Sequence, residues 1–88
     1  MQLIIMYKND VLKEAFRLTL VETRKQSGLS QMKLADESGL HRNFISLLET
    51  GQNVPSLITF YNLCDALSVS PKDFIEKIDK KALELSDT

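Results

Sequence analysis

Apolar side chains recur every three or four residues along most of the chain, which is the spacing of helices that bury one face. Glycine and proline separate these periodic stretches, and the alternating β-branched pattern that is typical of strands is scarce. The pattern therefore predicts an all-α fold of five short helices. Their expected ranges are 11–26, 31–38, 42–50, 57–67 and 71 to about 83.

Residues suited to cap helices stand at the starts of these ranges. Asn9 or Asp10 is the expected N-cap of the first helix, and Ser30, Ser56 and Ser70 are those of the second, fourth and fifth. The inward positions of all five helices then predict one core. Its expected members are Leu12, Phe16, Leu20, Thr23, Leu34, Ala35, Ile45, Leu48, Leu57, Phe60, Leu63, Cys64, Leu67, Phe74 and Ile78.

Composition narrows the class of protein further. A chain of 88 residues and 10.0 kDa is enough for one small domain. Its content of 43% hydrophobic and 26% charged residues excludes a disordered chain. One cysteine and one histidine exclude a disulfide framework and a zinc site built from those two residue types alone, so no cofactor is expected. Cys64 is expected to be a small buried hydrophobe rather than a redox sensor.

The amino end does not predict export or a membrane anchor. The longest apolar run, residues 3–6, is far shorter than the roughly 18 residues of a membrane span, and no signal peptide is evident. We therefore expect a cytoplasmic protein with no membrane partner. Residues 1–9 are expected to form an N-terminal arm or short strand before one domain at 10–88, and an extra helical turn is the alternative for residues 1–7.

Residues 28–51 predict two short helices joined by a turn centred on Gly39, which is a helix-turn-helix with its motif at about 30–50. The second helix of such a unit can enter the major groove of DNA. A specific resemblance rests on these strings: Gly-Leu-Ser-Gln at 28–31, Leu-Ala at 34–35, Ser-Gly-Leu at 38–40, Ile-Ser at 45–46, Leu-Glu at 48–49 and Leu-Cys-Asp-Ala-Leu-Ser-Val-Ser at 63–70. On these residues the chain resembles the XRE, or lambda-repressor-like, family of bacterial regulators. Its compact size and its His-Arg-Asn-Phe-Ile-Ser run are similar to the controller proteins of restriction–modification systems.

The third helix is expected to read bases with its first residues. Arginine can donate two hydrogen bonds to guanine and asparagine can pair with adenine, so Arg42 and Asn43 are the expected base readers. The resemblance implies that Gln31 contacts the DNA backbone and braces the start of the recognition helix. It also implies phosphate contacts from the amide side chains and backbone N–H groups of Gln52 and Asn53. The full set expected to contact double-stranded DNA is Gln31, Lys33, His41, Arg42, Asn43, Ser46, Leu47, Gln52 and Asn53.

Three members of this set have two interpretations. His41 either touches phosphate or only caps the third helix weakly. Leu47 either packs on thymine methyl groups or covers the adjoining loop. Lys33 either attracts phosphate or is an ordinary solvated side chain.

The resemblance also implies a structural ion pair between Arg24 and Glu49, which ties the recognition helix to the first helix. Arg24 is therefore not expected to read bases. The net charge of −1 is unevenly spread, because residues 1–48 carry seven basic and five acidic side chains, whereas residues 49–88 carry four and seven. This mild dipole suits a DNA-binding face backed by an acidic face.

Apolar residues left over from the core predict a dimer surface within residues 56–85. The expected interface residues are Ile58, Tyr61, Ile75, Ala82 and Leu85. Two alternatives concern residues 3–7, which either fold back over this patch or join the interface as paired strands.

These observations predict a sequence-specific transcriptional regulator that binds an inverted-repeat operator as a homodimer. The alternative is an antitoxin-like module with the same fold, whose main task is to hold a partner protein. An enzyme is not expected, because no nucleophile, base and orienting group come together, and no small-molecule ligand is evident.

Overall fold

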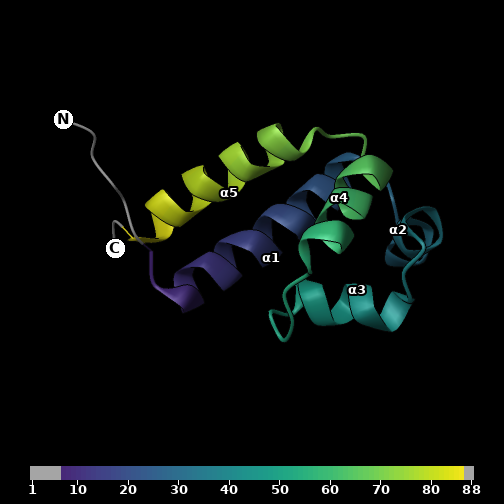
Figure 1. Cartoon of the computed structure of the whole chain (residues 1–88), viewed down its shortest axis with the longest axis horizontal. Helices are drawn as coiled ribbons and strands as arrows, with labels where there is room; N and C mark the ends of the chain where they lie inside the picture. Colours follow the sequence, from purple (N-terminus) through teal and green to yellow (C-terminus); the bar gives the residue numbers. More distant parts are fainter. Residues whose placement is uncertain (1–6, 87–88) are drawn as a thin grey trace.

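The computed structural model describes residues 7–86 and confirms the all-α fold (Figure 1). No strand is present among these residues. The five helices are α1 (Asn9–Gln26), α2 (Gln31–Ser38), α3 (Arg42–Glu49), α4 (Leu57–Ala66) and α5 (Pro71–Ser86). None of them is both long and apolar enough to cross a membrane.

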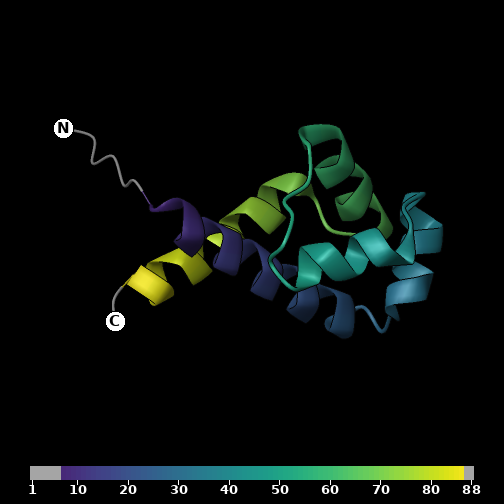
Figure 2. The ribbon, with the colours of Figure 1, turned by 90° about the horizontal axis from the view of Figure 1, so that it is seen from below.

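The two longest helices, α1 and α5, lie side by side and run in opposite directions (Figures 1 and 2). The three shorter helices gather around the carboxyl-terminal half of α1. In Figure 1, α3 lies on one side of α1 and α5 on the other, so the helix-turn-helix and the last helix face different directions. The arrangement leaves the recognition helix at an edge of the molecule.

The helix ends follow the predicted caps except at α1. The hydroxyl oxygens of Ser30, Ser56 and Ser70 each accept a hydrogen bond from the backbone N–H three residues later, at 3.0 to 3.2 Å. The prediction of Asn9 or Asp10 as the first N-cap is wrong, because α1 already begins at Asn9 and its cap position makes no side-chain hydrogen bond. Asp10 instead lies in the first turn, where its negative charge suits the positive end of the helix dipole.

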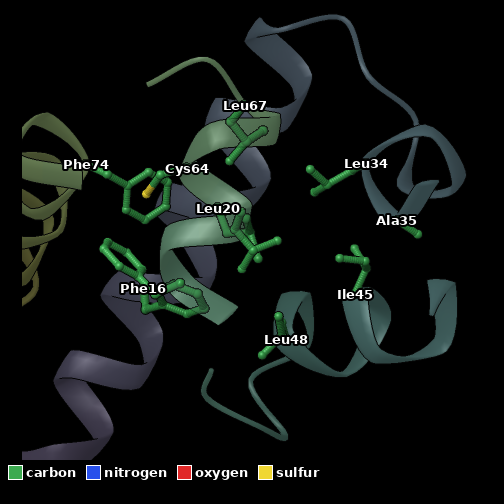
Figure 3. Close-up of a cluster of buried hydrophobic side chains, with 11 residues drawn as sticks. Phe16, Leu20, Leu34, Ala35, Ile45, Leu48, Cys64, Leu67 and Phe74 are labelled. Carbon is green, nitrogen blue, oxygen red and sulfur yellow. The ribbon is translucent and has the colours of Figure 1, made fainter. Parts of the chain in front are cut away.

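The core lies where all five helices meet (Figure 3). Phe74 of α5 packs against two other rings, with centroid distances of 6.1 Å to Phe16 and 5.4 Å to Phe60. Cys64 is buried beside this aromatic group, and burial raises the pKa of its thiol to about 11. It is a free cysteine, as expected of a small buried hydrophobe.

Two residues predicted to be in the core lie outside it. Leu12 is exposed near the start of α1, and Leu57 is 71% exposed at the start of α4. Both keep the helical spacing of the buried residues that follow them, Phe16 and Phe60, but their helices extend past the edge of the core at these ends. Periodicity identifies the inward side of a helix and cannot show where the neighbouring helix stops.

Residues 1–6 of the predicted N-terminal arm or strand lie outside the described residues, and the last residue of the predicted arm, Asn9, already belongs to α1. The structure gives no information on residues 1–6, so neither of the two alternatives for residues 3–7 is tested.

Candidate nucleic-acid interface

The predicted helix-turn-helix is formed by α2, a tight turn and α3. Gly39 ends α2 with a φ of 74°, a left-handed conformation that favours glycine. The N–H of Leu40 then donates to the carbonyl of Ala35 at 3.0 Å, which closes the end of α2. The chain turns here and α3 begins at Arg42.

An ion pair fixes α3 to α1. Glu49, the last residue of α3, accepts two hydrogen bonds from Arg24, with distances of 2.6 Å to Nε and 3.0 Å to Nη2. The exposed fractions of the two side chains are only 12% for Arg24 and 6% for Glu49. The remaining nitrogen, Nη1, donates to the carbonyl of Leu29 at 2.9 Å, so the same guanidinium also holds the turn between α1 and α2.

Gln31 joins this network. Its Nε2 donates to the Glu49 carboxylate at 2.9 Å, so Glu49 links the first residue of α2 to both α1 and α3. The contact that Gln31 makes with α3 is thus at the last residue of that helix, and its expected contact with the start of the recognition helix stays a prediction. One amide hydrogen and the side-chain oxygen of Gln31 are not used in this bond.

The first residues of α3 project outward. His41, Arg42 and Asn43 are all exposed, and no hydrogen bond from the His41 side chain caps the helix. The backbone of the same turn is fixed, since the carbonyl of His41 accepts from the N–H groups of Phe44 and Ile45 at 3.0 and 3.1 Å. Two side chains suited to read bases thus extend from a rigid support.

The next turn of α3 is less exposed. Ser46 and Leu47 are both half-buried, and Phe44 packs against the core. Leu47 is therefore partly covered by protein rather than fully open.

In the loop after α3, the backbone N–H groups that were expected to contact phosphate are already hydrogen-bonded within the protein. The N–H groups of Gln52 and Asn53 both donate to the carbonyl of Leu47, at 2.9 and 3.3 Å. The prediction that these N–H groups are available to phosphate is wrong, because a tight turn uses them to close the end of α3. Both side chains remain exposed, although the amide of Gln52 donates to Thr50 at 3.0 Å. Only the side chains of the two residues thus remain candidates for phosphate contact.

Lys33 lies on the exposed side of α2. Its ammonium group is 3.7 Å from Glu37, and 60% of its side chain is exposed. Such a surface pair is weak, so Lys33 can be drawn towards a phosphate at little cost.

A second surface lies between α4 and α5. Three of the predicted dimer residues are open to solvent, with exposed fractions of 76% for Ile58, 55% for Tyr61 and 52% for Ile75. The prediction for Ala82 is wrong, because it is fully buried one turn after Ile78, on the face of α5 that packs against the core. Leu85 is half-buried.

Tyr61 and Ile75 also line an apolar groove, which we call the α4–α5 groove. It has a volume of about 750 Å³ and includes Leu12, Val54 and Leu57. The sequence pattern placed Leu12 and Leu57 in the core and did not single out Val54, which lies in the loop before α4. The apolar residues near the starts of α1 and α4 were the available signal for this groove.

The five-helix fold and the exposed start of α3 define a small helix-turn-helix protein. Comparison with known proteins leads to the same class. The pattern of the family described as helix-turn-helix matches residues 20–74. The chain belongs to this family of XRE-type regulators, in which DNA binding and transcription regulation are the common function.

Two proteins with similar sequences are named as a transcriptional regulator and a control protein. The chain is 35% identical over 57 residues to the HTH-type transcriptional regulator y4dJ of Sinorhizobium fredii, covering 65% of this chain and 74% of that protein. It is 43% identical over 51 residues to the control protein C.BamHI of Bacillus amyloliquefaciens, covering 58% and 63%.

Solved structures of restriction–modification controller proteins are also similar. A single-residue variant of C.Esp1396I has a TM-score of 0.79 at 27% identity, covering 89% of this chain and 96% of that one. C.AhdI of Aeromonas hydrophila has a TM-score of 0.67 at 37% identity, covering 76% and 98%.

Proposed function

We propose that this protein is a sequence-specific transcriptional regulator that reads the major groove with α3 and binds an inverted-repeat operator as a homodimer. One observation carries the proposal. Arg42 and Asn43 project from the start of a helix whose far end is fixed by the buried network of Arg24, Glu49 and Gln31. A fixed helix holds its base-reading side chains in a defined register on DNA.

The proposed DNA surface combines base readers with backbone contacts. Arg42 and Asn43 read base edges, and Ser46 and Leu47 flank them one turn later. Gln31, Lys33, His41, Gln52 and Asn53 supply backbone contacts around this centre. This division follows the general rule that phosphate contacts position a protein and base contacts specify the sequence.

The proposed dimer surface is the α4–α5 groove with Ile58 beside it. A single recognition helix makes few contacts, so small readers reach tight specific binding as dimers. Exposed apolar residues concentrated at Ile58, Tyr61 and Ile75 are what a second copy would cover. Two chains that pair through this surface present two recognition helices.

The test is selection of bound sites from random duplex DNA, followed by footprinting of the selected site. The proposal predicts that one inverted repeat is enriched and protected. Recovery of unrelated sequences, with no protected site, would contradict it and would favour an interaction module with the same fold.

A further inference from the structure

Arg17 lies against the turn that follows α3. Gly51 begins this turn with a φ of 79°, and a β-carbon added to it would lie 3.3 Å from Cδ of Arg17 and 4.0 Å from its Nε. The Arg17 side chain therefore runs along the backbone of the turn. Figure 2 shows the middle of α1 passing beside the end of α3, where the turn begins. The guanidinium is thus placed next to the loop that carries Gln52 and Asn53.

Glu14 holds this guanidinium in one orientation. Its two carboxylate oxygens accept hydrogen bonds from Nε and Nη2 of Arg17, at 2.6 and 2.7 Å. The pair is one turn apart on α1, and the hydrogen bond from Arg17 keeps the pKa of Glu14 below its usual value. Glu14 is therefore charged at neutral pH, and its two hydrogen bonds to the Arg17 guanidinium are maintained.

This pair leaves part of Arg17 available. A guanidinium has five N–H groups, of which Glu14 takes two. The other three make no hydrogen bond to the residues that the structure describes, and the Arg17 side chain is 31% exposed. A planar cation with unused, fixed donors suits a phosphate group, which can accept two of them at once.

We propose that Arg17 is a further phosphate-binding residue of the DNA surface, with Glu14 as the residue that positions it. The proposal rests on the proposed function, because insertion of α3 into the major groove brings the following loop to the DNA backbone. It adds α1 to the elements that contact DNA, and no sequence motif points to it.

The test compares the salt dependence of binding for Arg17→Gln and Lys80→Gln on the selected site. Each phosphate contact contributes a slope of about 0.9 in the plot of log affinity against log salt concentration. Arg17→Gln should flatten the slope by about 0.9 per chain and weaken binding to all sequences alike. Lys80 is exposed on α5, on the other side of α1 from α3, so the same charge change there should have a much smaller effect. An equal change for both variants would show a general charge effect and overturn the proposal.

Two further measurements separate a phosphate contact from a structural role. Ethylation of single DNA phosphates should interfere with the native protein at one position in each half-site that no longer matters for Arg17→Gln. Arg17→Lys keeps a charge and should retain most of the slope. Unchanged ethylation interference for Arg17→Gln would contradict the proposal, even where the variant is less stable.

The positioning role of Glu14 is tested by Glu14→Ala. Without the carboxylate that holds Nε and Nη2, the Arg17 guanidinium loses its fixed orientation, so ethylation of the phosphate that depends on Arg17 should interfere less than in the native protein. Unchanged interference at that phosphate would contradict the role given to Glu14. If no DNA site is selected at all, the proposed function fails. If a selected site depends on Arg42 but not on Arg17, only this inference fails.

Discussion

The polar and charged side chains on and around α3 differ in their surroundings. Arg42 and Asn43 are exposed, and the fold does not depend on their side chains. Arg24 and Glu49, by contrast, use their charges on each other inside the protein. The type of residue alone does not decide its role, since Arg24 holds the scaffold whereas Arg42 is the proposed base reader.

Arg42→Ala should therefore relax base preference without loss of stability. The expected cost is about 1–3 kcal/mol at one base step of each half-site, because a bidentate contact to guanine is lost. Lys33→Ala is the matched control, and it should weaken binding to all sequences alike and reduce the salt dependence. Binding to single-base variants of the selected site measures both effects. An unchanged preference for Arg42→Ala would show that the assigned register of α3 is wrong.

The buried thiol of Cys64 predicts how the stability of the fold depends on pH. Its thiol has a pKa raised by burial to about 11, so the folded state keeps its proton at pH values where an unfolded thiol loses it. A raised pKa of this kind stabilises the fold below the unfolded pKa, and the contribution is lost as pH rises from about 8.5 towards 11. Denaturation of the native protein and of Cys64→Ala across this range measures it. The native protein should lose stability relative to the variant as pH rises, and parallel curves would contradict this.

At the scale of elements, the helix order and most inward positions followed from the sequence alone, because periodicity and caps are local properties. The errors concern Leu12, Leu57 and Ala82, whose exposure depends on where a neighbouring helix ends. Contacts between elements that are distant in sequence were predictable only through resemblance, as with Arg24 and Glu49. The bond from Gln31 to Glu49 and the position of Arg17 against Gly51 depend on tertiary geometry that no local pattern encodes.

The network at Glu49 joins three elements, so its loss should affect the whole domain. Glu49→Ala leaves the buried guanidinium of Arg24 without its carboxylate and should cost about 3–5 kcal/mol of unfolding free energy. Glu37→Ala is the control, because its pair with Lys33 lies on the surface and should contribute at most about 1 kcal/mol. Urea denaturation measures both variants. Equal losses would show that Glu49 does not hold the helices together.

At the scale of the whole molecule, α3 and the α4–α5 groove occupy separate surfaces. Arg42 and Asn43 lie on α3, whereas Tyr61 and Ile75 lie on α4 and α5. A second copy can therefore cover the groove while α3 stays open to DNA. The loop that carries Gln52 and Asn53 continues into the groove wall at Val54, so the two surfaces are connected by a short segment.

Tyr61→Asp tests the dimer surface. A second copy would bury the new carboxylate at the contact, at a cost of several kcal/mol, whereas in the single chain Tyr61 is already 55% exposed. The variant should be a folded monomer with greatly weakened operator affinity. Sedimentation at micromolar concentration, together with circular dichroism as a control for folding, measures the outcome. An unchanged dimer mass would exclude this surface.

The most direct test of the central claim compares the full selected site with one of its half-sites. Two recognition helices related by two-fold symmetry should select an inverted repeat whose half-site centres are about 10 base pairs, or roughly 34 Å, apart. Affinities for the full site and for an isolated half-site in duplexes of equal length, measured at physiological salt, decide it. We expect the half-site to bind far more weakly than the full site. Equal affinities would contradict a homodimer that reads DNA with two copies of α3.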